Sequence, residues 1–231
     1  MLASSKPAQE YFIYLPPCYD ESPTIRYPAL YLLHGQTFEA DQWIRLGAVA
    51  AINDLILSGE SMPFIIVFPD DRYWYSEDSG DTFGGRLVDD LIPHIDMTHR
   101  TIQNREKRAI GGISRGAGWA LRLGLTRWEL FGHIGLHSLA VLERDGKFIE
   151  DWLEEIPSSA YPTIYMDIGE QDTEFGMSKL VEETLTKFQI PHELHIHPGE
   201  HTEEYWSAHV EEYIRWYADG WNNPQKPCPC E

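Results

Sequence analysis

The chain is predicted to form an α/β fold, in which a mostly parallel central sheet carries helices on both faces. Apolar runs alternate with helical patterns from end to end, which is the first observation behind this prediction. The second is that several runs are continuously apolar, as strands covered on both faces should be. Alternation of strands and helices favours parallel pairing through crossover helices. With 231 residues, 42% of them hydrophobic, the chain is long enough for one such domain with a full core.

The individual elements follow from the spacing of the apolar residues. Strands are expected at residues 11–15, 29–33, 64–68, 108–112, 133–137, 163–168 and 193–197. Helices are expected at residues 48–57, 87–97, 117–125, 177–188 and 203–216. Pro93 interrupts the second helix, so we expect a kink or a late start there. Residues 1–231 are therefore expected to form a single domain, with an irregular tail from about residue 222.

The charge balance excludes some partners. Asp and Glu number 37 against 18 Lys and Arg, which gives a formal net charge of −19. This excess argues against binding to nucleic acid or to anionic membranes, because no basic surplus is available to neutralise phosphates. No apolar run approaches the length of a membrane span, and the N-terminus lacks the charged and apolar regions of a signal peptide. We expect a soluble protein, either a secreted or periplasmic mature domain or a cytoplasmic one.

Cysteines are too few for a disulfide scaffold, since the chain has only Cys18, Cys228 and Cys230. Pairing of Cys18 with one of the two tail cysteines in an oxidising compartment is one interpretation. Three unpaired thiols are the other, and the sequence does not separate them.

One stretch, KRAIGGISRGAG at residues 107–118, carries a recognisable catalytic pattern. A short apolar strand runs into GISRG, with Ser114 at its centre, and then directly into a helical pattern. In a G-x-S-x-G turn the serine takes a strained backbone conformation, and the glycines let strand and helix pass closely. Such a turn presents the hydroxyl to a base, so Ser114 is the predicted nucleophile.

A suitable acid and histidine follow Ser114 in the chain order Ser, Asp, His, which is that of the α/β-hydrolase triad. Asp172 and His201 each follow a predicted strand, and ligands bind beyond the carboxyl ends of parallel strands. We expect His201 to be the general base and Asp172 to orient its ring. Thr202 is the expected N-cap of the last helix, which leaves His201 on the loop just before that helix.

Other residues compete for two of these roles. His197, on the last strand, and His209, on the last helix, are alternatives for the base. Asp167, within the preceding strand, and Glu170 or Glu174, after it, are alternatives for the acid. Each of these carboxylates also has the simpler interpretation of a solvated loop charge.

These landmarks resemble the family of α/β-hydrolases that includes esterase D-like enzymes, feruloyl esterases of carbohydrate esterase family 1 and the antigen 85 mycolyltransferases. The resemblance covers nearly the whole chain and rests on YLPPCYD, YPALYLLHG, DDLIPHID followed by HRT, the serine turn and the terminal PGEH. It implies an α/β-hydrolase fold. Family members typically have methionine after the serine and glycine before the last histidine, whereas this chain has Arg115 and Glu200. Arg115 leaves the substrate preference open, because its side chain starts beside the acyl site.

An oxyanion hole is also expected, because the tetrahedral intermediate of an ester needs two donors aimed at its oxygen. The backbone N–H of Arg115 is one donor, and the resemblance implies the backbone N–H of Gln36 as the other. His34 is expected to be a structural hydrogen-bonding residue. Residues 41–43 and 73–75 are expected to flank the cleft, with ordinary packing as the alternative. The candidate substrate-binding residues are Trp43, Trp74 and Trp206.

A cluster of histidines offers a competing kind of site. His192, His195, His197 and His201 lie within ten residues, and His195 shares a strand face with His197, as two metal ligands would. No cysteine or second cluster in the sequence completes the set, so neither a metal nor any other cofactor is expected.

Taken together, the residues favour a serine carboxylester hydrolase that acts through an acyl-serine intermediate. Its substrate is expected to be a small-molecule or polysaccharide-linked ester, with feruloyl or acetyl esters of plant polysaccharide as the most specific version. An acyltransferase of the same fold would differ only in whether water or another alcohol deacylates the serine. A binding protein on a hydrolase scaffold is the alternative of another class, and the intact Ser, Asp and His argue against it. The oligomeric state stays open.

Overall fold

The computed structural model of the chain describes residues 2, 8–17, 19–71 and 82–221. The cysteine pairing, the expected tail, the segment 73–75 and Trp74 therefore lie outside the described residues.

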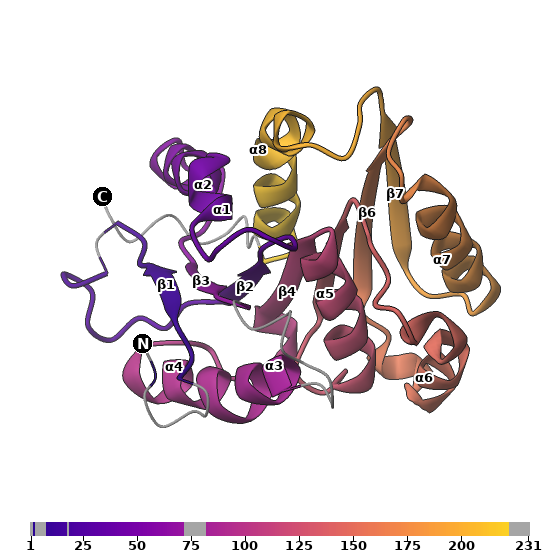
Figure 1. The fold of residues 1–231 in the computed structure, drawn as a ribbon. Coiled ribbons are helices and arrows are strands. Elements are labelled where there is room, and N and C mark those ends of the chain that lie inside the picture. Colours follow the sequence, from indigo (N-terminus) through magenta and orange to yellow (C-terminus); the bar gives the residue numbers. More distant parts are fainter. Residues whose placement is uncertain (1, 3–7, 18, 72–81, 222–231) are drawn as a thin grey trace.

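Seven strands form one sheet in the order β1-β3-β2-β4-β5-β6-β7 (Figure 1). They are β1 (Tyr11–Tyr14), β2 (Ala29–Leu33), β3 (Ile65–Pro69), β4 (Arg108–Ile113), β5 (His133–His137), β6 (Thr163–Gly169) and β7 (His192–His197). β1 pairs antiparallel with β3, and the other neighbouring pairs are parallel. The strand order reverses between β2 and β4, where the register pairs Leu33 with Gly112. The sheet is mostly parallel, as predicted, and this reversal marks the place where such sheets bind ligands.

Helices cover both faces of the sheet (Figure 1). One face carries α1 (Gln42–Arg45), α2 (Ala48–Leu57) and α8 (Glu203–Asp219), and the other carries α4 (Ile92–Thr98), α5 (Arg115–Thr126), α6 (Ile149–Glu155) and α7 (Phe175–Lys187). A short α3 (Thr82–Gly85) and a π-helical segment (Arg86–Leu91) precede α4, and single 3-10 turns lie at Arg105–Lys107, Asp145–Lys147 and Ser158–Ala160. Each face has its own hydrophobic cluster, because successive strand residues point to opposite sides. In β3, Ile65 and Val67 join one cluster, whereas Ile66 and Phe68 join the other.

Two helical features bear on the sequence-based expectations. Pro93 lies directly after the π-helical segment, and the α-helical pattern starts there at Ile92, later than the expected residue 87. Helical backbone runs without a break from Thr82 to Thr98, so the π-helical segment is the irregularity beside the proline. α6 was not expected: it has seven residues, of which only Ile149 and Leu153 are buried, and two turns are too short for an apolar period to emerge.

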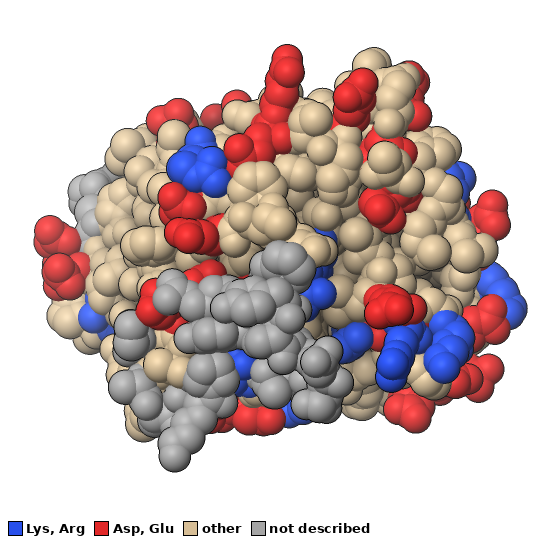
Figure 2. All heavy atoms as spheres, in the orientation of Figure 1, with Lys and Arg blue, Asp and Glu red and all other residues tan. Residues whose placement is uncertain are grey.

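Within the part of the chain that the structure describes, every helix is too short or too polar to cross a bilayer. Asp and Glu side chains are scattered over the face drawn in Figure 2, where Lys and Arg are fewer. This surface agrees with the net charge of −19.

Candidate active site

Ser114 stands at the sharp turn between β4 and α5. Its backbone angles, φ 56° and ψ −119°, lie in a region that non-glycine residues rarely adopt and that costs about 1–3 kcal/mol. Backbone hydrogen bonds hold the turn: the Ser114 N–H donates to the His137 carbonyl at 2.8 Å, and the Ser114 carbonyl accepts from Gly118 at 3.1 Å. These hydrogen bonds hold the turn against the end of β5, so that Ser114 lies at the carboxyl end of β4.

The two glycines of the GISRG turn are required by close backbone approaches. A Cβ at Gly112 would collide with the Gly116 carbonyl, and a Cβ at Gly116 would collide with the carbonyl oxygens of Leu33 and His34. α5 therefore starts in direct contact with β4 and with the end of β2. The glycines therefore let Ser114 lie close to the ends of β2 and β4, the two strands between which the strand order reverses.

His201 lies on the loop between β7 and α8. Thr202 is the N-cap of α8, as predicted, and its hydroxyl accepts a hydrogen bond from the Tyr205 N–H. His201 Nε2 lies 2.8 Å from Ser114 Oγ, and His201 Nδ1 lies 2.9 Å from each carboxylate oxygen of Asp172. A ring nitrogen that faces a carboxylate carries the proton, so Nε2 presents its lone pair to the serine hydroxyl. The three predicted residues are joined in one hydrogen-bonded chain.

Asp172 follows β6 in a tight turn, and its side chain is fully buried. Burial by itself would raise the pKa of this carboxyl group. Hydrogen bonds from His201 and from the Glu174 N–H, with a smaller contribution from the Ser138 hydroxyl, outweigh that effect and hold the pKa below its ordinary value of 3.8. Asp172 is therefore ionised at neutral pH and accepts hydrogen bonds at its oxygens.

The alternative acids and bases occupy other places. Asp167 is fully buried, and its Oδ1 lies 2.8 Å from His137 Nδ1 rather than near His201. Glu174 is the N-cap residue of α7, and Glu170 accepts from the Gln171 amide. His197 is on β7 and His209 is on α8, and their rings stack on each other with 4.2 Å between centroids.

A pocket of about 340 Å³ opens in front of Ser114 and His201. Aromatic lining comes from Phe38 and Trp206, and Gln36 contributes to the same wall. The other lining residues are Gly35, Thr37, Thr202 and Glu203. Trp206 is 2% exposed, and its ring stands edge-on to the His201 ring at 5.1 Å. The pocket is the space in which a substrate can reach the serine hydroxyl.

Trp43 does not flank this pocket, contrary to the sequence-based expectation. It is fully buried, and its indole N–H donates to the Leu33 carbonyl at 2.9 Å. Gln42 is also fully buried, and its side-chain oxygen accepts from the Gly35 N–H at 2.8 Å. Both side chains hydrogen-bond to the backbone at the end of β2 and just after it. They do not border the pocket, because α1 packs against the sheet.

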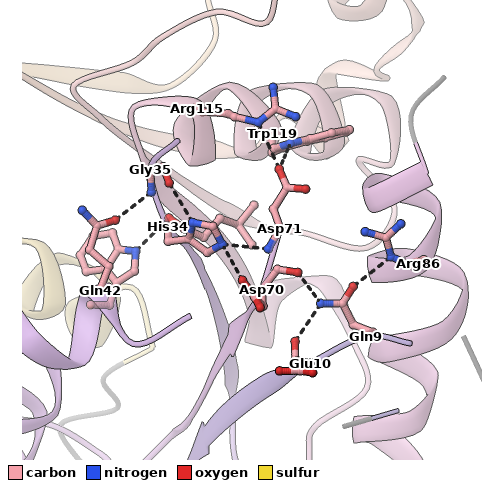
Figure 3. Close-up of polar contacts among 12 residues, drawn as sticks. Gln9, Glu10, His34, Gly35, Gln42, Asp70, Asp71, Arg86, Arg115 and Trp119 are labelled. Atoms are coloured by element: carbon pink, nitrogen blue, oxygen red, sulfur yellow. Dashed lines mark hydrogen bonds and ion pairs between the residues drawn. The ribbon is translucent and has the colours of Figure 1, made fainter. Parts of the chain in front are cut away.

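A second polar network holds the loop that follows β2 at His34 and Gly35 (Figure 3). His34 Nε2 accepts from the Asp71 N–H at 2.8 Å, so Nδ1 carries the proton and donates to the Gly35 carbonyl at 2.8 Å. His34 is thus the structural hydrogen-bonding residue that was expected. Asp71 Oδ2 accepts from Arg115 Nε at 3.1 Å and from Trp119 Nε1 at 3.0 Å. These bonds direct the Arg115 side chain toward Asp71.

Two contributors were missed from the sequence. Ser138 follows β5 with a φ of 48°, its hydroxyl helps to lower the pKa of Asp172, and the same hydroxyl accepts from the Trp206 indole at 2.8 Å. Asp71 lies just beyond the carboxyl end of β3. In both cases a polar residue after an apolar strand was a usable signal, because such positions face the ligand edge of a parallel sheet.

The chain is similar to known esterases. The profile of the family described as "Putative esterase" matches residues 6–217. An endo-1,4-beta-xylanase/feruloyl esterase of Xylanibacter ruminicola is 30% identical over 167 residues, which cover 68% of this chain and 22% of that protein. An esterase of Mycobacterium tuberculosis is 33% identical over 134 residues, which cover 54% of this chain and 28% of that protein. The chain spans less than a third of the length of these curated relatives.

Solved structures of similar shape are α/β-hydrolase-fold esterases. A ferulic acid esterase superposes with a TM-score of 0.80 at 22% identity, covering 92% of this chain and 93% of the other. A ferulic acid esterase from Anaeromyces mucronatus in complex with ferulic acid has a TM-score of 0.75 at 23% identity, covering 92% and 86%. The S-formylglutathione hydrolase of Staphylococcus aureus has a TM-score of 0.72 at 16% identity, covering 91% and 92%. The predicted α/β-hydrolase fold is confirmed.

Proposed function

Because the chain belongs to the esterase family whose profile it matches, we propose that it is a serine carboxylester hydrolase with a Ser114–His201–Asp172 triad. The observation that carries this proposal is the hydrogen-bonded chain from Ser114 Oγ through His201 to Asp172, at 2.8 and 2.9 Å. It ends in a pocket that a substrate can enter.

In the proposed reaction, Ser114 Oγ attacks the ester carbonyl carbon while His201 Nε2 takes the hydroxyl proton. Asp172 keeps Nδ1 protonated and stabilises the imidazolium that forms. The carbonyl oxygen becomes an oxyanion, and the backbone N–H groups of Gln36 and Arg115 donate to it. Collapse of the tetrahedral intermediate expels the alcohol, which takes its proton from His201. A water molecule then repeats the two steps on the acyl-serine and releases the acid.

For the substrate, we propose an ester of a flat phenolic acid with a polysaccharide, a feruloyl ester being the reference compound. Phe38 and Trp206 give the pocket two aromatic walls beside the serine, and a volume of about 340 Å³ is adequate for a small aromatic acyl group. The Xylanibacter ruminicola relative carries feruloyl esterase in its name, which supports the same acyl class. Acetyl esters are the second class to be tested.

Labelling and turnover together test the proposal. A fluorophosphonate probe should label the wild-type protein on one residue, and Ser114→Ala should not be labelled. In a panel of p-nitrophenyl acyl esters, methyl ferulate and acetylated xylan, the wild type should hydrolyse methyl ferulate with the highest kcat/KM. Ser114→Ala should lose about six powers of ten in kcat, the size of effect expected for a triad nucleophile.

Labelling that persists in Ser114→Ala would reject the triad. A wild-type protein that is neither labelled by the probe nor able to hydrolyse any ester would favour the binding-protein alternative. Faster release of the acyl group to an added alcohol than to water would identify an acyltransferase. A preference for acetylated xylan over methyl ferulate would move the substrate to the acetyl class while leaving the mechanism intact.

A further inference from the structure

A second group of functional side chains lies between the edge strand β7 and helix α8. His195 and His197 occupy alternate positions of β7 and therefore share a face, and Glu212 reaches them from α8. One donor atom from each of the three residues lies within 4.8 Å of the others. The sequence indicated the two histidines as a possible metal pair, but the residue that completes the set is distant in the chain.

The spacing of these atoms is close to that of ligands around one metal ion. His195 Nδ1 lies 3.5 Å from Glu212 Oε1, and His197 Nε2 lies 3.6 Å from Glu212 Oε2. Ligands bound tetrahedrally to zinc at 2.0–2.2 Å are about 3.3–3.6 Å apart.

The surrounding hydrogen bonds direct lone pairs toward that centre. His195 Nε2 lies 2.9 Å from Glu193 Oε2, and a protonated Nε2 leaves the Nδ1 lone pair facing Glu212. Glu212 Oε1 accepts from the Tyr165 hydroxyl at 2.7 Å, which orients the carboxylate. His197 Nε2 is shielded from solvent and forms no hydrogen bond with any residue that the structure describes. A carboxylate behind one histidine and a donor behind the ligating carboxylate are the typical supports of a metal site.

The other histidines of the cluster have separate partners. His192 Nδ1 lies 2.7 Å from the Ile190 carbonyl, and His201 belongs to the Asp172 pair. His209 stacks its ring on that of His197, and its Nδ1 lies 3.5 Å from Glu212 Oε2. The three residues whose donor atoms all lie within 4.8 Å of one another are His195, His197 and Glu212.

We propose that His195, His197 and Glu212 bind one divalent first-row transition-metal ion, with zinc as the reference ion. Two imidazoles and a carboxylate are common zinc ligands, and a solvent molecule would take the fourth position. All three side chains are about one-third exposed, so an ion can enter from solvent. The bound metal would tie β7 to α8, the two elements on either side of the loop at residues 198–202 that carries His201. Its role is stabilisation of this corner, independent of the ester chemistry.

Calorimetric titration of zinc into protein without a polyhistidine tag tests the site directly. The protein is first treated with EDTA and dialysed. One zinc ion per chain should bind, and His197→Ala or Glu212→Gln should weaken the affinity at least tenfold. Glu193→Gln, which alters only the support of His195, should weaken it up to tenfold. Zinc at a hundred times its dissociation constant should raise the wild-type Tm by about 5 °C or more.

The matched control is His192→Ala, which removes an imidazole from the same strand without touching the proposed ligands. It should bind zinc as the wild type does. Binding that is absent in the wild type, or equal in wild type and a His195→Ala/His197→Ala double variant, would overturn the proposal. If Glu212→Gln fails to fold by circular dichroism, the partly exposed His195→Gln provides the same test. Loss of zinc binding with intact ester hydrolysis separates this proposal from the proposed function.

Discussion

Among the residues that the structure describes, two histidines, His137 and His201, direct Nδ1 at the carboxylate of an aspartate, and only His201 reaches a serine. In the pair at the pocket, His201 Nδ1 lies 2.9 Å from Asp172, and Nε2 lies 2.8 Å from Ser114 Oγ. In the second pair, His137 Nδ1 lies 2.8 Å from Asp167 Oδ1. That pair is fully buried, and its Nε2 meets the Tyr217 hydroxyl at 3.1 Å.

The buried pair is saturated with tyrosine hydroxyls. Tyr205 and Tyr213 both donate to Asp167 Oδ2, at 2.9 and 2.6 Å. Burial, followed by the negative charge of Asp167, raises the pKa of each of these phenols, so both stay protonated donors. Glycine at positions 111 and 135 leaves room for Tyr217, because a Cβ at either position would collide with its hydroxyl.

A histidine–aspartate pair is structural or reactive according to its burial and to the group that its second ring nitrogen meets. The buried pair joins β5 and β6 to α8 through hydrogen bonds that are all internal. The pocket pair leaves His201 one-quarter exposed beside a strained serine turn. The same two residue types thus stabilise the core in one place and present a base to a nucleophile in the other.

The largest effect is expected from neutralising the acid of the pocket pair. Asp172→Asn should lower kcat by about 10⁴-fold, because the amide no longer favours the productive His201 tautomer. Steady-state hydrolysis of a p-nitrophenyl ester, with the Tm measured in parallel, checks the effect. The Tm should move far less than in the buried pair. A fall of less than tenfold in kcat would remove Asp172 from the mechanism and return Glu170 or Glu174 to consideration.

The same substitution in the buried pair should act on stability instead. Asp167→Asn leaves three donors without a carboxylate and should reduce the free energy of unfolding by about 3 kcal/mol. The corresponding fall in Tm is about 6–12 °C for a chain of this size. Urea denaturation and thermal melting followed by circular dichroism measure both quantities.

Turnover by the folded fraction of Asp167→Asn should stay within a few-fold of the wild type. A loss of activity as large as that of Asp172→Asn, with an unchanged Tm, would make the second pair a participant in catalysis.

A smaller effect is expected at Ser138, which directly follows His137 of the buried pair. Its hydroxyl helps to lower the pKa of Asp172 and accepts a hydrogen bond from the Trp206 indole. Ser138→Ala should therefore lower kcat about tenfold with little change in KM, since the loss of one polar partner costs about 1 kcal/mol. Ser207→Ala, on the surface of α8, is the matched control and should change neither constant. A change in KM alone would assign Ser138 to substrate binding.

The smallest expected effect is on the pH dependence of stability. The hydrogen bonds that lower the pKa of Asp172 mean that the unfolded chain binds its proton at a higher pH than the folded protein does. The ionised carboxylate therefore contributes stability that is fully present above about pH 5 and is lost as the pH falls through the folded-state pKa. The difference in unfolding free energy between the wild type and Asp172→Asn should shrink below about pH 4.

Urea titrations of both proteins between pH 3 and pH 6 measure that difference. Asp54→Asn, an exposed substitution on α2, is the control and should leave the pH dependence of the wild type unaltered. A difference that widens toward low pH would mean that the pKa of Asp172 is raised in the folded protein.

Local patterns in the sequence were sufficient for most of the fold. Apolar period, turn glycines and Pro93 act over a few residues, so they predicted the strands, the long helices and the late start of α4. The Ser114 turn and the Thr202 cap are local as well, because each is defined by backbone geometry within five or six residues. α6 escaped prediction since only two of its residues are buried.

What the sequence by itself determined is therefore where the chain bends, which face of each element is apolar, and which serine is held in a strained turn. Only the tertiary structure decided which carboxylate meets which histidine. Asp167 and Asp172 are five residues apart, yet the alternation of β6 buries the first beside His137 and the following turn carries the second to His201. The burial of Trp43 and the meeting of His195 with Glu212 depend in the same way on helices that pack across the sheet. Contacts between distant segments depend on the packing of the whole fold, so local patterns in the chain do not predict them.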